Sequence, residues 1–190
     1  MIGKSLLIFL ISTVLLSSCQ DEVDAYNFVG DSIIARWPID ETLPSQVVFN
    51  YGNSGSGITY IRSLSGKFFG TEVAVLIGTN DYRYFKPEKV DNYVRVYLDA
   101  INQLTDRNIY LFSVLPREFK KDDADINVYI ANFNSKIKEA LSDYPNIIYI
   151  DVFEDFMKDG HINYQYYSDG LHLNIYGYTL LSSTFLKTIY

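Results

Sequence analysis

The chain has one cysteine, two histidines and no excess of basic residues among its 190 residues. With a single cysteine, a disulfide within the chain is impossible. Two histidines are few for a catalytic zinc site, and no histidine–carboxylate cluster has metal-ligand spacing, so we expect no metal and no cofactor. Sixteen Lys and Arg against 23 Asp and Glu give a formal charge of −7, which disfavours a nucleic-acid partner because such proteins present a basic face.

Sequence patterns of several enzyme classes are also absent. The chain has no Gly-x-Ser-x-Gly pentapeptide, which carries the nucleophile of α/β-hydrolases, and no Walker-type or dinucleotide-binding glycine loop. No internal repeat, low-complexity tract or second domain boundary is visible. A length of 190 residues with 48% hydrophobic residues therefore predicts one globular domain with a substantial core.

The first 18 residues have the pattern of a secretory signal peptide. Lys4 supplies a short positive region, the apolar stretch Leu6–Leu16 is interrupted only by Ser12 and Thr13, and small residues follow. This stretch is shorter than the roughly 20 apolar residues that a membrane-spanning helix needs. We therefore expect residues 1–18 to be removed on export.

Leu16-Ser17-Ser18-Cys19 resembles the lipobox of bacterial lipoproteins. The resemblance implies cleavage before Cys19, which then carries lipid. Residues 19–25 then form the lipidated cysteine and a short tether, and residues 26–190 form the single folded domain. We expect an exported lipoprotein with a membrane as its partner, on the periplasmic or cell-surface side. The alternative is ordinary secretion with a free thiol at Cys19.

Near-continuous apolar runs recur along the rest of the chain, as is typical of strands buried on both faces. The predicted strands are Tyr26–Gly30, Val47–Tyr51, Val73–Gly78, Ile109–Leu115 and Ile147–Val152.

Stretches with apolar residues three or four apart separate these runs and predict helices. The predicted helices are Pro87–Leu104, Ile126–Leu141, a last helix after Asn174, and a shorter, less regular helix over Ile58–Phe69. Asp125 and Asn174 are the expected N-caps. Strands alternating with helices predict an α/β fold, with a parallel sheet covered by helices on both faces.

Four short segments each supply one part that serine-based acyl chemistry needs. They are Gly30-Asp31-Ser32, Asn50 to Gly55, Gly78-Thr79-Asn80-Asp81 and Asp169-Gly170-Leu171-His172. The first three each follow a predicted strand, so we expect them to gather at one edge of the sheet, where such folds bind ligands. Each segment alone is explained as well by a structural turn, but all four in this order indicate hydrolysis of ester bonds.

Ser32 is the candidate nucleophile, and it needs a base to take its proton. His172 is the candidate base, because Asp169 three residues earlier can turn back and hold the imidazole in one tautomer. His161, the other histidine, lies in a polar stretch and is interpreted as a surface residue. It stays the alternative base.

The tetrahedral intermediate of acyl transfer needs hydrogen-bond donors aimed at its oxyanion. The candidates are the Ser32 N–H, a glycine N–H from the Asn50 segment and the Asn80 side-chain amide. Gly52, Gly55 and Gly57 are all available in that segment.

These segments resemble the blocks of the SGNH hydrolases, also called GDSL-like esterases and lipases, over most of the chain from Phe28 to about Tyr178. The resemblance implies a three-layer α/β/α sandwich with a parallel sheet of about five strands, of SGNH or flavodoxin-like type. It implies Ser32, His172 and Asp169 as the triad. It also implies the N–H groups of Ser32 and Gly55 and the Asn80 amide as the oxyanion hole, with Gly55 favoured by its offset from Asn50.

Three further residues are candidate substrate contacts. Arg36 lies four residues after Ser32, so on one helix the two would share a face, although a surface ion pair explains Arg36 equally well. Tyr82 and Arg83 follow Asn80 and should border the pocket.

The function expected from the sequence is a serine esterase that hydrolyses small acyl esters, acetyl above all, on carbohydrate. Short-chain lipid esters are the second choice of substrate. An acyltransferase uses the same residues with a sugar hydroxyl in place of water. A binding lipoprotein that has lost the chemistry is the remaining alternative.

Overall fold

The computed structural model describes residues 25–120 and 122–190. The predicted signal peptide and Cys19 lie outside the described residues, as does the tether up to residue 24. Ala25, placed in the tether from the sequence, instead begins the first strand. None of the helices in the described part is long and apolar enough to cross a membrane.

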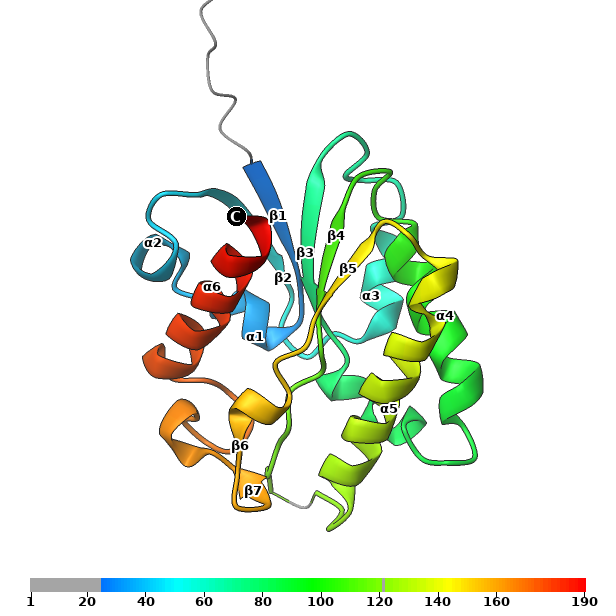
Figure 1. Ribbon diagram of the computed structural model, residues 1–190, viewed down its shortest axis with the longest axis vertical. Helices are drawn as coiled ribbons and strands as arrows, with labels where there is room; N and C mark the ends of the chain where they lie inside the picture. Colours follow the sequence, from blue (N-terminus) through cyan, green and yellow to red (C-terminus); the bar gives the residue numbers. More distant parts are fainter. Residues whose placement is uncertain (1–24, 121) are drawn as a thin grey trace, which may run out of the picture.

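Five parallel strands form the central sheet, in the order β2-β1-β3-β4-β5 (Figure 1). The strands are β1 Ala25–Gly30, β2 Val47–Gly52, β3 Glu72–Leu76, β4 Ile109–Phe112 and β5 Ile147–Ile150. A separate two-stranded antiparallel sheet pairs β6 Met157–Lys158 with β7 His161–Ile162. The sequence did not predict this small sheet, because each of its strands has only two residues.

The described residues form six α-helices. They are α1 Ser32–Ala35, α2 Ile39–Thr42, α3 Ile58–Ser63, α4 Val90–Asn102, α5 Ile126–Ala140 and α6 Ile175–Ile189. Four short 3₁₀ helices complete the described elements: η1 Thr79–Tyr84, η2 Leu141–Asp143, η3 Glu154–Phe156 and η4 Tyr164–Tyr166.

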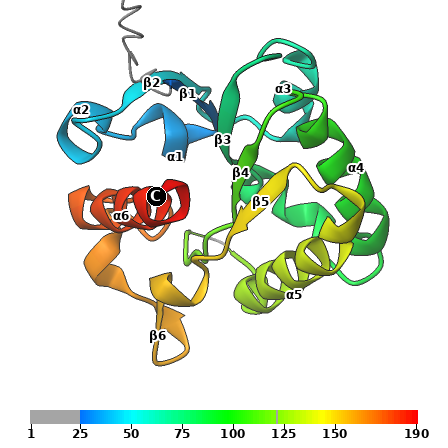
Figure 2. The ribbon, with the colours of Figure 1, turned by 45° about the horizontal axis from the view of Figure 1, so that its top comes forward.

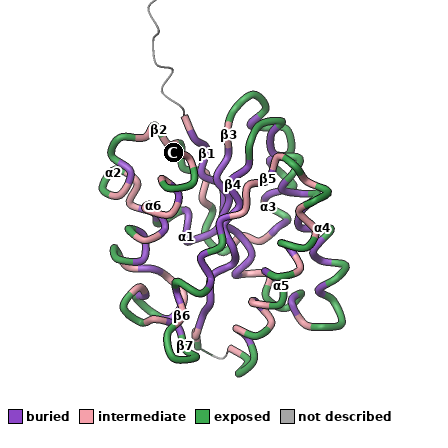
Figure 3. The backbone as a smooth tube through the Cα atoms, in the orientation of Figure 1, coloured by how far each residue is buried: buried purple, intermediate pink, exposed green. Residues whose placement is uncertain are grey.

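The helices cover both faces of the sheet, as the sequence predicts (Figure 2). One core cluster lies between the sheet and helices α3, α4 and α5, with Tyr97 and Phe133 among its largest buried side chains. The other lies between the sheet and the α1–α2 and α6 segments, around Trp37 and Phe185. The fold is thus the three-layer α/β/α sandwich, and its buried residues follow the central strands (Figure 3).

The structure corrects several boundaries. The predicted helix over Ile58–Phe69 ends at Ser63, and the Phe68 N–H instead donates to Leu104 O. Helix α4 begins at Val90, so Pro87 lies in the turn before it. Strand β2 is not buried on both faces: it is an edge strand, and Phe49 is 52% exposed.

Candidate active site

Ser32 lies at the turn where β1 passes into α1. Gly30 ends the strand, and Asp31 is the N-cap of α1, with its Oδ1 accepting from the Ile33 N–H at 2.9 Å. Ser32 is the first residue of the helix and is only 6% exposed. Its backbone N–H therefore belongs to the first turn, where N–H groups have no partner within the helix.

The four sequence segments meet at this turn. His172 Nε2 lies 3.1 Å from Ser32 Oγ, although 140 residues separate the two in the chain. On the other side of the imidazole, His172 Nδ1 lies 2.8 Å from Asp169 Oδ2. In this order the histidine can take the proton of the serine hydroxyl, while the carboxylate orients the imidazole.

Helix α6 brings His172 to the serine. Asn174 caps the helix as expected, since its Oδ1 accepts from the N–H groups of Tyr176 and Gly177. The Tyr178 hydroxyl donates to Ile33 O at 2.9 Å, which joins α6 to the helix that carries Ser32. The contact of serine with histidine therefore depends on the packing of α6 over α1.

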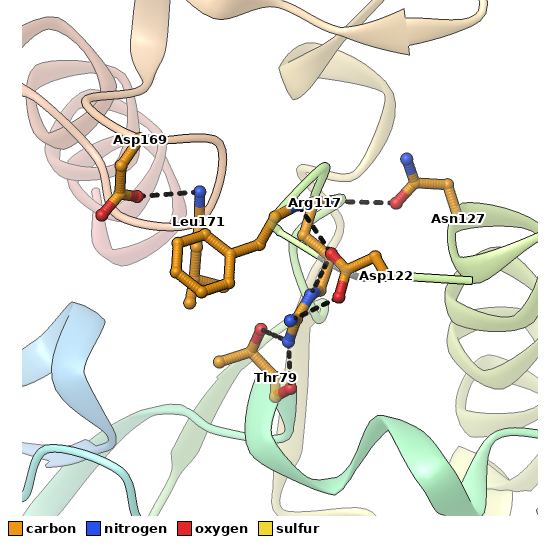
Figure 4. A network of polar contacts seen from close by, with 7 residues as sticks. Thr79, Arg117, Asp122, Asn127, Asp169 and Leu171 are labelled. Atoms are coloured by element: carbon orange, nitrogen blue, oxygen red, sulfur yellow. Dashed lines mark hydrogen bonds and ion pairs between the residues drawn. The ribbon is translucent and has the colours of Figure 1, made fainter. Parts of the chain in front are cut away.

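The Asp169 carboxylate is held in its ionised form. Burial favours the neutral form, but hydrogen bonds from the His172 imidazole and from the N–H groups of His172 and Leu171 outweigh it and lower the pKa of Asp169 to about 2. The bond from the Leu171 N–H measures 3.0 Å (Figure 4). A carboxylate charged at neutral pH can orient the imidazole and stabilise the imidazolium.

Two of the candidate oxyanion donors, Gly55 and Asn80, lie on segments joined by a hydrogen bond. Asn80 lies in η1, directly after β3, and its Nδ2 donates to Ser56 O at 2.8 Å. A carboxamide has two N–H donors, so the amide keeps one for a ligand while the other fixes its direction.

The three glycines of the Asn50 segment differ in their surroundings. The Gly52 N–H donates to Asn50 Oδ1 at 2.8 Å, and a Cβ on Gly57 would lie 2.2 Å from the Asp81 carboxylate. Gly55 has a φ of +78° and open space around it. These contacts leave Gly55 a better candidate donor than Gly52.

The remaining candidates are spread around the site. Arg36 is exposed and is the C-cap of α1, and its backbone N–H donates to Ser32 O at 3.1 Å. The Tyr82 ring lies under the Arg117 guanidinium, at 4.8 Å. Arg83 lines a neighbouring cavity of about 630 Å³. The His161 side chain is 72% exposed and pairs with Glu118, not with the serine.

Sequence reasoning missed an ion pair beside the site. Arg117 is 5% exposed and makes two hydrogen bonds to the Asp122 carboxylate, at 2.9 and 2.7 Å (Figure 4). The Asp122 side chain is buried as well, at 8% exposed. In the sequence Asp122 stands in a charged run, which gives no sign that one member is buried.

Residues 28–180 match the GDSL-like lipase/acylhydrolase family. The chain belongs to this family.

Among the described residues, no group of three or more His, Cys, Asp or Glu side chains is arranged to hold a metal ion.

Two solved structures resemble the chain along most of its length. A protein from Streptococcus pneumonia, provisionally assigned as a platelet activating factor, is 27% identical, with a TM-score of 0.69 over 90% of this chain and 87% of that one. An acetylxylan esterase from Geobacillus stearothermophilus is 17% identical, with a TM-score of 0.63 over 87% of this chain and 94% of the esterase. The second likeness concerns the fold alone.

A curated relative is the N-acylneuraminate cytidylyltransferase of Escherichia coli. It is 30% identical over 179 residues, which make up 89% of this chain and 41% of the relative. The chain therefore spans about two-fifths of the length of that enzyme.

Asp31, beside the serine, is a fully buried carboxyl group. Burial raises its pKa, as does the nearby Asp81, while the bond from the Ile33 N–H and the charge of Arg117 oppose the rise; the pKa reaches about 7. Its Oδ2 has no hydrogen-bond partner among the described residues.

We expect Asp31 to make the stability of the protein depend on pH. Because its pKa is higher in the folded state, folding takes up a proton between about pH 4 and 7, and stability falls as the pH rises through that window. Between pH 5 and 8 the wild type should lose about 2 kcal/mol of unfolding free energy through this group. Asp31→Asn keeps an acceptor for the Ile33 N–H and should lack that loss. Urea unfolding of both proteins at each pH measures it, and equal losses would contradict the assignment.

Proposed function

We propose that the protein is a serine esterase with Ser32 as nucleophile. The observation that carries the proposal is the chain of contacts from Ser32 Oγ to His172 Nε2 at 3.1 Å and from His172 Nδ1 to Asp169 at 2.8 Å. Membership of an acylhydrolase family supports it.

In the proposed reaction, Ser32 Oγ attacks the ester carbonyl carbon while His172 Nε2 takes the hydroxyl proton. The N–H groups of Ser32 and Gly55 and the free N–H of the Asn80 amide hold the oxyanion. His172 then gives the proton to the leaving alcohol, and an acyl-enzyme remains. Water, deprotonated by the same imidazole, releases the acid and restores the serine.

Substitution of the two histidines tests this assignment. His172→Ala and Ser32→Ala should each lower kcat on a short p-nitrophenyl ester by at least about 10³-fold, because the members of a triad act as a unit. His161→Ala is the matched control, since it removes the same side chain from a surface position. It should leave kcat within about twofold of wild type. Retention of activity in Ser32→Ala would contradict the assignment of Ser32 as nucleophile.

We propose an acetyl ester on a sugar as the substrate. The fold shared with an acetylxylan esterase favours this class by analogy. The cavity of about 630 Å³ beside the site has charged residues in its lining, which suits a polar substrate better than a long acyl chain.

An acidic sugar is a second candidate for the alcohol portion. Arg62, Arg83 and Lys89 line that cavity beside Asp81 and Glu88, and within the described chain none of the three cations has an ion pair. The relative from Escherichia coli is named for an acidic sugar, N-acylneuraminate, which also supports an acidic sugar as the alcohol portion.

A comparison of acetylated sugars separates the two candidates. If the cavity receives an acidic group, Arg83→Ala should raise KM about tenfold for an acetylated acidic sugar and leave a neutral acetylated xylo-oligosaccharide unchanged. Thr59→Ala, on the same cavity wall, removes no charge and is the control. Equal effects of Arg83→Ala on both substrates would contradict the acidic sugar.

We further propose that the protein acts as an exported bacterial lipoprotein, anchored through lipid on Cys19. The resemblance of residues 16–19 to a lipobox supports this proposal. In a bacterial host, Cys19→Ser should move the protein from the membrane fraction to the soluble fraction, as fractionation and immunoblotting measure. Wild-type protein in the soluble fraction would contradict the anchor.

A further inference from the structure

Arg117 is the only Lys or Arg with a buried side chain among the described residues. Its guanidinium contacts three residues: Asp122, Thr79 and Tyr82, whose ring centroid lies 4.8 Å from it. Nε and Nη2 donate to the two carboxylate oxygens of Asp122, and Nη1 donates to Thr79 O at 2.7 Å. Thr79 directly precedes Asn80, so the bond fixes the backbone that carries the candidate oxyanion donor (Figure 4).

The geometry of the Arg117–Asp122 ion pair favours a role in positioning neighbouring groups over a role in stabilising the fold. A buried ion pair is weak support for stability, since the loss of hydration offsets much of the attraction. A planar guanidinium bound at both oxygens of one carboxylate has a fixed direction, however. The Asp122 carboxylate is fixed as well, because its Oδ2 also accepts from the Phe119 N–H at 2.7 Å. The guanidinium that binds Thr79 is therefore held in a fixed orientation.

The backbone around Arg117 also contacts the loop that carries the candidate base. The Glu118 N–H donates to Gly170 O at 2.8 Å, and the Tyr167 hydroxyl donates to Pro116 O at 2.7 Å. Gly170 has a φ of +81°, and a Cβ there would lie 2.2 Å from Glu118 O. Residues 116–119 thus lie between the Asn80 loop and the Asp169–His172 loop, but only the Arg117 side chain binds the Asn80 loop.

We propose that Arg117, held by Asp122, is a positioning residue of the oxyanion hole, which it orders through Thr79 and the Asn80 amide. The inference rests on the proposed esterase function. If the proposal is right, loss of the Arg117 side chain lowers kcat by displacing the Asn80 amide. The position of His172 should not change, because residues 116–119 hold its loop through backbone atoms.

A double-mutant cycle tests this coupling. Asn80→Ala should lower kcat on a short acyl ester by about 10²- to 10³-fold, the usual effect of one oxyanion donor. Arg117→Met should lower kcat by about tenfold in the wild type, because a misplaced donor loses most of its effect. In the Asn80→Ala background, Arg117→Met should change kcat by less than about twofold.

Three further readouts separate positioning from general loss of structure. In Arg117→Lys, which keeps a cation near Asp31 and over the Tyr82 ring, KM should stay within about twofold. The pH at which kcat/KM is half-maximal should not move in that variant, because the imidazole is untouched. Arg117→Lys should recover part of kcat, since the ammonium reaches Thr79 O without the two-point contact to Asp122. Asp122→Asn leaves Arg117 in place but removes the charge that orients its guanidinium, so it should also lower kcat. It replaces Arg117→Met if that variant does not fold.

Thr105→Ala is the matched control for destabilisation. Thr105 is 2% exposed, and its hydroxyl donates to Thr71 O at 2.7 Å and accepts from the Arg107 N–H at 3.1 Å, before the amino ends of β3 and β4. It should lower the melting temperature and leave kcat per folded molecule unchanged in both backgrounds.

The outcomes are distinguishable. If Arg117→Met and Asp122→Asn lower kcat equally with and without the Asn80 amide, or if Arg117→Lys shifts the pH profile, the positioning role is wrong and the esterase proposal stands. If Asn80→Ala and Ser32→Ala leave turnover intact, the proposed function itself fails.

Discussion

The contact between Ser32 Oγ and His172 Nε2 is the interaction on which the rest of the site depends. It joins the first turn of the fold to the last loop, 140 residues later, and the parallel sheet makes this possible. Because β1 lies between β2 and β3, the loops after these strands open at the same edge as Ser32. Helix α6 then packs on the α1 side, where Trp37 Nε1 donates to Ser182 Oγ at 3.0 Å. The site is therefore a consequence of strand order and of one helix-packing interface.

Features encoded locally could be predicted from the sequence. The apolar runs gave the five strands of the central sheet, and Asp169 and His172 form their contact within three residues. Features that depend on distant partners could not be predicted. The bond from Arg117 to Thr79 spans 38 residues, and a charged run shows nothing of the burial of Asp122. The exposure of β2 follows from its place at an edge of the sheet. The apolar pattern of a strand does not tell where in the sheet that strand lies.

Two expected helix caps show the same limit. Asn174 and Asp125 each precede a helix and belong to residue types that cap well. The Asn174 side chain accepts two backbone N–H groups, and its Nδ2 also donates to Gln165 O at 2.9 Å, so a second loop holds the cap in place. Asp125 is the N-cap of α5 but makes no side-chain capping bond. A cap is thus predictable as a position, whereas its hydrogen bonds depend on what packs beside it.

Two carboxyl groups flank the serine, and their surroundings move their pKa values in opposite directions. Three hydrogen bonds around Asp169 outweigh burial and lower its pKa to about 2. Asp31 receives one such bond, burial dominates, and its pKa rises to about 7. A charged Asp31 next to Ser32 would oppose the negative charge that develops on the carbonyl oxygen of an ester, whereas a neutral one would not. Asp169 lies behind the imidazole, where its charge stabilises the imidazolium. A carboxyl group with the pKa of Asp31 is about half ionised at pH 7. In the proposed reaction, the placement therefore puts the charged carboxylate where positive charge forms and leaves the group beside Ser32 partly neutral.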